Sequence, residues 1–195
     1  MAVIKEKFNF QNKIKYLISN PDVFFEKIKS EKSIKDAFLI DAIARAFIAS
    51  LTYFFIFSII LIFARNYQDY FGPNSGFIIP LIIFGWFFIG IFKNFIVSGI
   101  IYLILKMYKI TNAYQKTYNV YVYSSLPSLV ISIIPYVGLL SWIYSYYLMI
   151  TGMAKVHNIS IGKSALACLL PILILILIVA VPVLWLIINF HLLNI

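Results

Sequence analysis

The stretch VYSSLPSLVISIIPYVG, residues 122–138, decides how this chain folds. It is apolar enough to enter a lipid bilayer, yet it contains prolines, serines and tyrosines. Every backbone polar group in the hydrocarbon of a bilayer must be satisfied inside the protein. Helix-breaking residues are therefore tolerated only where neighbouring helices or hydroxyl groups replace the lost hydrogen bonds. The stretch predicts membrane helices that pack closely on one another.

The whole chain has the composition of an integral membrane protein. Of its 195 residues, 63% are hydrophobic and 12% are charged, and the mean hydropathy is +0.95. Soluble domains carry about 25% charged residues. No cleavable signal peptide is expected, because residues 1–36 are lysine-rich and contain no apolar core. We divide the chain into a cytoplasmic basic segment, residues 1–36, and a membrane domain, residues 37–195.

Apolar runs between clusters of charge predict an all-α fold, a polytopic membrane bundle of five transmembrane helices. A span needs about 20 mainly apolar residues. The predicted spans cover residues 37–64, 77–105, 118–136, 139–154 and 165–190. The second span is long enough for a re-entrant pair to be an alternative to one tilted helix.

The positions of the lysines orient this bundle. They cluster before residue 37, at 106–116 and at 155–163, whereas all seven acids lie before residue 70. Cytoplasmic loops are enriched in Lys and Arg, and five spans place all three basic segments on the cytoplasmic side. We expect a multi-pass protein of the cell membrane with its N-terminus inside and its C-terminus outside.

The N-terminal segment is expected to contain a short amphipathic helix. Asn20 and Pro21 predict its N-cap and first position, and Ser33 predicts the start of the next helix. The helix either lies on the anionic inner leaflet or docks a cytosolic protein. The candidates for contact with lipid or partner are its apolar face and adjoining lysines: Phe24, Phe25, Ile28, Lys27 and Lys29.

Residues 118–136 and 139–154 are expected to form a tight antiparallel hairpin, because the connection PYVG is short. Facing residues in such a hairpin have a constant index sum. Three pairs share one sum: Ser132 with Ser141, Ser128 with Ser145, and Tyr121 with Gly152. Small residues let helices approach closely in lipid. The predicted packing stripe consists of Ser124, Ser128, Ser132, Ser141, Ser145 and Gly152.

Several short elements occur along the chain in a recognisable order. They are NPDVFF at 20–25, Tyr123-Ser124-Ser125-x-Pro127, Pro135-x-x-Gly138, Trp142, Gly152, and Val156-His157 followed by Ser160, Lys163 and Ala165. Together they resemble the Yip family, membrane proteins that interact with Ypt and Rab GTPases. The resemblance covers residues 20–185 and implies five spans with a cytoplasmic N-terminus. Eukaryotic members are linked to vesicle traffic; prokaryotic members, which this chain resembles, exist without those GTPases.

Lys93 is the outlier of the second span, since it lies near the middle of an apolar run. A lysine at the bilayer midplane costs about 2.5–3.5 kcal/mol on insertion scales, so it should face the bundle. Asp41 is nearer the cytoplasmic end and has Arg45 four residues on as a partner. No carboxylate is expected at the depth of Lys93. A structural anchor and a functional lysine are both open interpretations.

The sequence contains no pattern typical of an enzyme: no nucleophile–base pair, zinc-protease motif or phosphate-binding glycine loop. His157 is interpreted as a solvated loop residue without further ligands, so no metal or cofactor is expected. The net charge of +9 suits anionic lipid and not nucleic acid. We expect a non-enzymatic scaffold or adaptor that holds lipid or an unknown protein partner. The alternative is a small transporter or lipid-handling protein that uses Lys93.

The predicted topology is testable with reporter fusions. A reporter that is active only in the cytoplasm should be active after Lys116 or Lys163 and silent after Ile195, because basic loops stay inside. An active fusion at Ile195 would contradict the five-span topology.

Overall fold

The computed structural model describes residues 10–63, 75–110, 114–131, 134 and 136–193, and every regular element in these ranges is an α-helix. The helices are α1 (Phe10–Ser19), α2 (Pro21–Ile28), α3 (Lys35–Phe63), α5 (Ser75–Met107), α6 (Tyr114–Ile131), α7 (Val137–His157) and α8 (Ile161–Leu193). The all-α prediction is confirmed. The second predicted span is one continuous helix, α5, and not a re-entrant pair.

The five predicted spans correspond in order to α3, α5, α6, α7 and α8, with boundaries shifted by a few residues. Within the described side chains, three helical segments are long and apolar enough to cross a membrane: Lys35–Ile59, Pro80–Met107 and Val137–His157. A shorter apolar segment covers Ile161–Ile174. These helices support a polytopic bundle, and the count of five spans stays a prediction.

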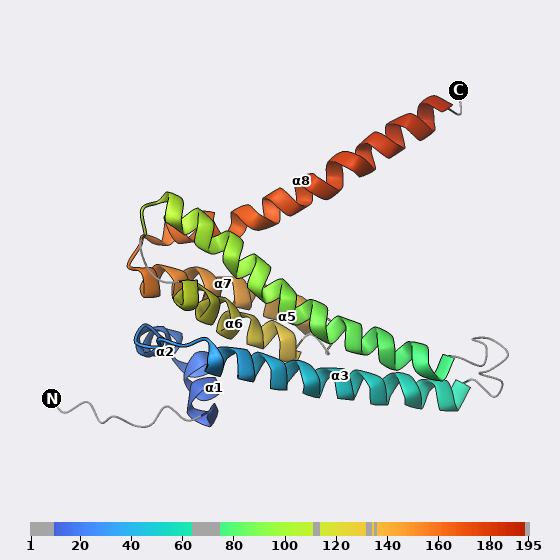
Figure 1. Cartoon of the computed structure of the whole chain (residues 1–195), viewed down its shortest axis with the longest axis horizontal. Coiled ribbons are helices and arrows are strands. Elements are labelled where there is room, and N and C mark those ends of the chain that lie inside the picture. Colours follow the sequence, from blue (N-terminus) through green and yellow to red (C-terminus); the bar gives the residue numbers. More distant parts are fainter. Residues whose placement is uncertain (1–9, 64–74, 111–113, 132–133, 135, 194–195) are drawn as a thin grey trace.

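Helix α6 lies in the middle of the bundle and packs against α3, α5 and α7, with α2 over one end (Figure 1). Nine of its 18 residues are buried, including Asn119, Tyr123 and Ser124. The first part of α8 packs on α7 and α5, and the rest of α8 runs away from the other helices. Since its neighbours shield α6 from lipid, α6 can carry polar residues that an exposed membrane helix could not.

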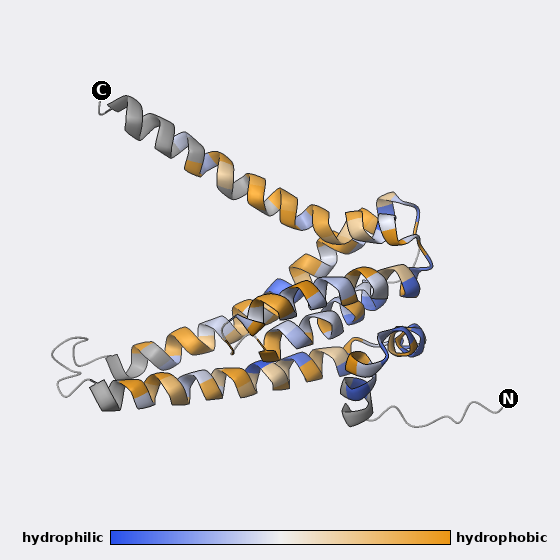
Figure 2. Ribbon diagram, turned by 180° about the vertical axis from the view of Figure 1, so that it is seen from behind, coloured by the Kyte–Doolittle hydropathy of each residue, from blue (hydrophilic) through white to orange (hydrophobic). Residues whose placement is uncertain are grey.

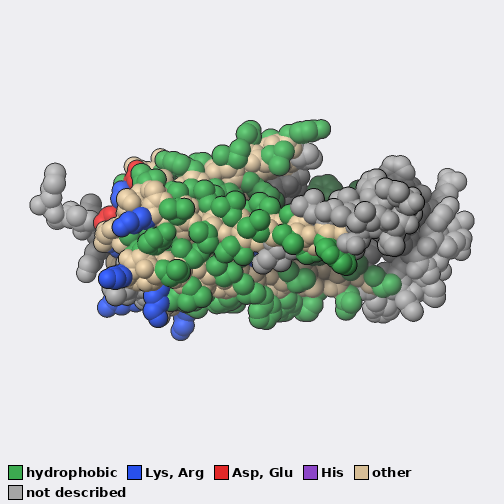
Figure 3. Space-filling view, turned by 90° about the horizontal axis from the view of Figure 1, so that it is seen from above, with side chains coloured by type: hydrophobic (Ala, Val, Ile, Leu, Met, Phe, Trp, Pro, Cys, Tyr) green, Lys and Arg blue, Asp and Glu red, His purple; other side chains and the backbone are tan. Residues whose placement is uncertain are grey.

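The outer faces of the bundle are strongly apolar, as Figures 2 and 3 show. Large hydrophobic side chains on α3, α5, α7 and α8 are exposed, among them Phe54, Leu81, Trp86, Ile143 and Leu177. Lys and Arg side chains gather at one end of the molecule (Figure 3). An apolar belt with charge confined to the end is the distribution expected of membrane helices.

The predicted hairpin of α6 and α7 has the expected register where it can be checked. The backbone N–H of Ser128 donates to Ser145 Oγ over 3.1 Å. Ser141 is buried, but its hydroxyl donates to the carbonyl of Gly138 in its own helix. The expected partner of Ser141, Ser132, lies outside the described residues.

Gly152 has a different neighbour from the one predicted. A Cβ placed on Gly152 would come within 2.6 Å of the Phe25 ring, and the three nearest atoms all belong to that ring. The pairing with Tyr121 is therefore not what requires a glycine here. Gly152 lets the aromatic ring of α2 lie directly on the backbone of α7.

The hairpin register can be tested with paired cysteines in a chain whose Cys168 is replaced by alanine. Cysteines at Ser128 and Ser145 should crosslink readily in membranes, because the two residues are joined by a hydrogen bond. Cysteines at Ser128 and Ile150 serve as the control and should not. Equal crosslinking of the two pairs would contradict the register.

Candidate functional site

Helices α1 and α2 form a cap on one end of the bundle. Asn20 is the N-cap of α2, as predicted: its side chain accepts a hydrogen bond from the backbone N–H of Val23 (3.3 Å). The helix then turns its apolar face inward onto α7 and α6. The cap is therefore part of the folded domain, and we call these two helices the N-terminal cap.

The apolar face of α2 is not available to lipid or partner as the sequence suggested. Phe24, Phe25 and Ile28 are at most 1% exposed. The ring of Phe24 meets the ring of Tyr123 on α6 edge to face, with centroids 5.3 Å apart. An amphipathic pattern shows that one face of a helix is buried, but it does not show whether that face packs against protein or against lipid. Here the apolar face of α2 packs against the bundle.

Lys13 fastens the cap to the bundle. Its ammonium group donates to Glu31 (2.7 Å), to Asp36 (2.9 Å) and to the phenolic oxygen of Tyr123 (3.1 Å). Burial alone would lower the pKa of Lys13, but the hydrogen bonds to two carboxylates and a phenol raise this pKa above its usual value. Lys13 is thus a charged residue that joins α1 to the α2–α3 connection through Glu31, to α3 through Asp36 and to α6 through Tyr123.

The two candidate lysines of α2 also have partners within the chain. The Lys27 ammonium lies 4.3 Å from the ring centroid of Tyr16. Lys29 donates to the side chain of Asn158 over 2.7 Å, and Asn158 ends α7 in a left-handed conformation. These contacts hold the cap; a role for either lysine in binding lipid stays a prediction.

The cap completes a surface that we call the basic end. It comprises α1, α2, the start of α3 and the helix ends on either side of the α5–α6 and α7–α8 connections. Eleven lysines and four carboxylates among the described residues lie there. Its exposed lysines are Lys15, Lys32, Lys35, Lys106, Lys109 and Lys163. The three basic segments of the sequence thus gather at one end, as the predicted topology requires.

A second polar group lies inside the bundle, between α3 and α5. Asp41 is fully buried and accepts hydrogen bonds from Arg45 Nε (2.9 Å) and from the side-chain amide of Asn94 (2.7 Å). The pairing of Asp41 with Arg45 was expected from their spacing. Arg45 also reaches the Asn94 oxygen over 3.4 Å. A Cβ on Gly90 would overlap the Arg45 guanidinium, so the absence of a side chain there makes room for it.

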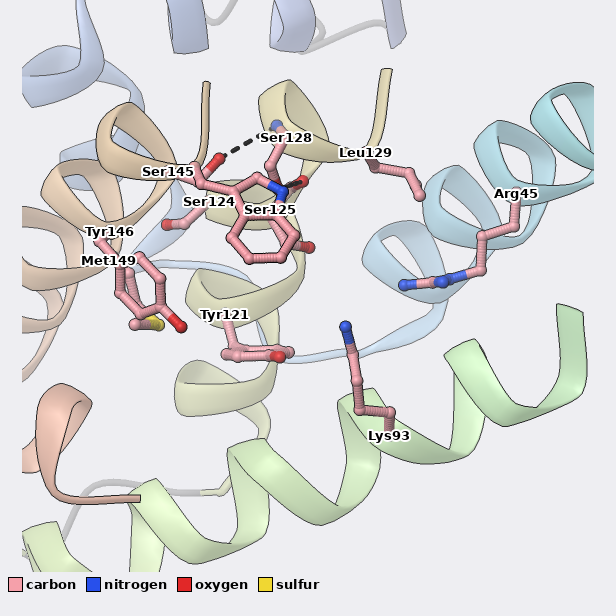
Figure 4. A pocket seen from close by; sticks show the side chains of 11 residues that line it. Arg45, Lys93, Tyr121, Ser124, Ser125, Ser128, Leu129, Ser145, Tyr146 and Met149 are labelled. Carbon is pink, nitrogen blue, oxygen red and sulfur yellow. Dashed lines mark hydrogen bonds between the residues drawn. The ribbon is translucent and has the colours of Figure 1, made fainter. Parts of the chain in front are cut away.

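Arg45 and Lys93 line a cavity of about 300 Å³ whose floor is α6 (Figure 4). The opposite wall comes from α7, including Trp142, Ser145 and Tyr146. In Figure 4 the ammonium group of Lys93 points into this space, between the ring of Tyr121 and the guanidinium of Arg45. Lys93 lines the cavity but is an exposed residue, so its burial inside the bundle stays a prediction. Lys93 has no hydrogen bond or ion pair among the residues that the structure describes.

The cavity contains cations and hydroxyl groups, and the one carboxylate near it among the described residues, Asp41, is already bound to Arg45 and Asn94. Such a lining can bind and neutralise an anion, but it offers no free acid–base pair.

His157 is not a solvated loop residue, as the sequence had suggested. It is buried at the end of α7, and its Nε2 lies 3.1 Å from Thr117 Oγ1. No group of three metal-ligating side chains occurs among the described residues.

The sequence did not reveal three contributors to these sites. Asn94 and Gly90 act on residues of α3 that lie about fifty positions earlier, and nothing in the local pattern marks them. Lys13 lies in a stretch that resembles any basic tail. Its separation of 110 residues from Tyr123 leaves no periodic signal.

Residues 15–183 match the Yip1 domain. The chain belongs to the Yip1 domain family. This Yip1 domain protein is also similar to an uncharacterised protein of Methanocaldococcus jannaschii, with 34% identity over 114 residues, which are 58% of this chain and 78% of that protein. No solved structure matches the chain. The family confirms a multi-pass membrane protein, and both Lys13 and the cavity residues lie within or next to the matched region.

The role of Lys13 as a fastener predicts a selective effect of Lys13→Met. Hydrogen bonds to charged groups contribute roughly 1.5–3 kcal/mol, so the cap should open more easily while α3–α7 stay folded. Hydrogen exchange in α1 and α2 should rise by at least tenfold. Lys15→Met is the control, because Lys15 is exposed. If both variants exchange like the parent, Lys13 does not hold the cap.

Proposed function

We propose that this Yip1 domain protein is a non-enzymatic membrane scaffold that gathers anionic lipid, and through it or beside it a protein partner, at its basic end. The observation that carries the proposal is the fixed cap. The cap orders lysines from segments far apart in the sequence into one face, where a free basic tail would leave them dispersed. We further propose that this face lies in the cytoplasm, where the leaflet is anionic.

The charge distribution at the basic end supports lipid attraction. The carboxylates there are largely engaged internally: Glu31 and Asp36 hold Lys13, and Asp22 accepts from Lys155 over 3.0 Å. The exposed lysines are thus left to act on their surroundings. Each lysine close to an anionic membrane surface contributes about 1 kcal/mol of attraction, and their common face lets these contributions add.

A second candidate function is lipid handling or transport through the bundle. The cavity favours it, because Arg45 and Lys93 open into a space at the depth of apolar helices. A purely structural lysine would be expected to have a direct partner, and Lys93 makes no hydrogen bond or close ion pair with a described residue; Asp41 acts on it only at longer range. No carboxylate is among the residues that line the cavity, and the nearby Asp41 is bound to Arg45 and Asn94, which argues against proton coupling.

Enrichment of anionic lipid tests the scaffold function. In phosphatidylcholine vesicles with a small fraction of spin-labelled phosphatidylserine, the parent should enrich the labelled lipid at its surface. Replacing Lys32, Lys109 and Lys163 together by glutamine should lower this enrichment several-fold, because up to about 3 kcal/mol of attraction is removed. Replacing the same three by arginine should leave the enrichment unchanged, and high salt should weaken it.

Two results would reject the scaffold. One is full enrichment by the triple glutamine variant. The other is movement of lipid or solute across vesicles by purified protein, at a rate abolished by Lys93→Met, which would establish the second candidate in its place.

A further inference from the structure

We propose that the cavity between α3, α5, α6 and α7 is a binding site for one oxyanion, a phosphate or carboxylate, carried on an apolar tail. The site would use Arg45 and Lys93 for the anion and the wall around Trp142 for the tail. This inference deepens the second candidate function by naming its ligand class. It concerns binding alone and requires no transport.

The first argument is the charge balance of the cavity. Asp41 and Arg45 form an ion pair (2.9 Å), so Arg45, Asp41 and a protonated Lys93 together carry one excess positive charge, although Asp41 also attracts Lys93 at longer range. Arg45 lies ten residues from the start of α3, roughly 15 Å along the helix, and Lys93 lies fourteen residues from the end of α5, roughly 21 Å. Both are therefore at hydrocarbon depth, where an unpaired charge is costly. A bound anion would supply the missing counter-charge.

The second argument is that Arg45 is held in place before any ligand arrives. Asp41 accepts from its Nε, Asn94 accepts from one terminal nitrogen, and the missing side chain of Gly90 lets the guanidinium lie against α5. A preorganised guanidinium binds phosphate or carboxylate with less loss of side-chain freedom than a mobile one. The carboxylate of Asp41 thus positions the arginine and does not close the site.

The third argument is a hydroxyl that lacks a partner. Ser124 lines the cavity and is 1% exposed, yet its Oγ makes no hydrogen bond with any described residue. A buried hydroxyl without a partner costs about 1–3 kcal/mol. Ser125 and Ser128, which also line the cavity, donate to carbonyls of their own helix. The Ser124 hydroxyl is closed to water in this arrangement, so it becomes a donor to an oxyanion only when its side chain turns into the cavity.

The fourth argument concerns the tail. Trp142 is 58% exposed although it lines the cavity, so the site reaches the outer surface of the bundle. The exposed residues beside it on α7, Leu139, Leu140 and Ile143, are apolar. With about 300 Å³, the cavity is at the small end of ligand sites. It suits a compact acidic head, whose chain would leave past Trp142 into the lipid.

The test uses the full chain with Trp86→Phe and Trp185→Phe, so that Trp142 is the one remaining tryptophan. The protein is placed in phosphatidylcholine nanodiscs and titrated with phosphatidic acid whose acyl chains are brominated, because bromine quenches tryptophan on contact. Brominated phosphatidylcholine is the matched probe. Quenching by the phosphatidic acid should saturate at a mole fraction about tenfold lower.

Variants separate the cavity from the surface. Lys93→Met should remove the preference for phosphatidic acid, and Lys93→Arg should retain it. Gly90→Ala should weaken it by displacing Arg45, whereas Gly85→Ala, with open space around its Cβ, should not. The Lys32, Lys109 and Lys163 glutamine variant should keep the preference, so a failure of the scaffold function leaves this result intact.

The outcomes are distinct. Equal quenching by the two brominated lipids, or an unchanged preference in both Lys93→Met and Gly90→Ala, would overturn the proposal. Loss of the preference only in the surface variant would also overturn it and assign the attraction to the basic end. Competition by inorganic phosphate in the buffer would support the oxyanion site and identify a free anion, in place of a lipid, as its ligand.

Discussion

The rest of the structure depends on one constraint: the polar helix α6 must find its hydrogen-bond partners inside the protein, with few exceptions such as the Ser124 hydroxyl. Lipid offers none. The hydrogen bond from the Ser128 backbone to Ser145 joins α6 to α7 one residue after Pro127. The side chain of Asn119 reaches back to the carbonyl of Ser33 over 2.9 Å. These contacts fix α6 as the centre around which α3, α5, α7 and the cap assemble.

The central position of α6 explains why the helices differ in polarity. The outer helices carry the lipid-facing hydrophobic surface, and α6 carries hydroxyl groups, an amide and prolines. A cavity floored by α6 therefore has polar groups available at membrane depth, which an ordinary apolar bundle would not have. The same arrangement provides the surface on which the N-terminal cap packs, because the ring of Tyr123 contacts Phe24 and its hydroxyl accepts a hydrogen bond from Lys13.

The parts of this fold that could be predicted from sequence are those set by local pattern. Apolar run length placed the helices, and the index sum of the hairpin identified the contact of Ser128 with Ser145. The burial of Phe24 by protein, the hydrogen bond of His157 and the placement of Arg45 by Gly90 were missed. Each depends on which helices become neighbours, and one sequence does not contain that information. The apolar face of α2 was correctly recognised, but the sequence did not show that the bundle, and not lipid, buries it.

Two lysines show how this fold separates structural from functional charge. Lys13 is 4% exposed and is surrounded by two carboxylates and a phenol, so its charge is fully compensated and its role is to hold the cap. Lys93 points into a cavity whose carboxylate already serves Arg45. Compensating Lys93 in the same way would have required one more acid near α5, and the described bundle provides none. The fold thus compensates the charge of the buried Lys13 and leaves the exposed Lys93 with its charge directed at the cavity.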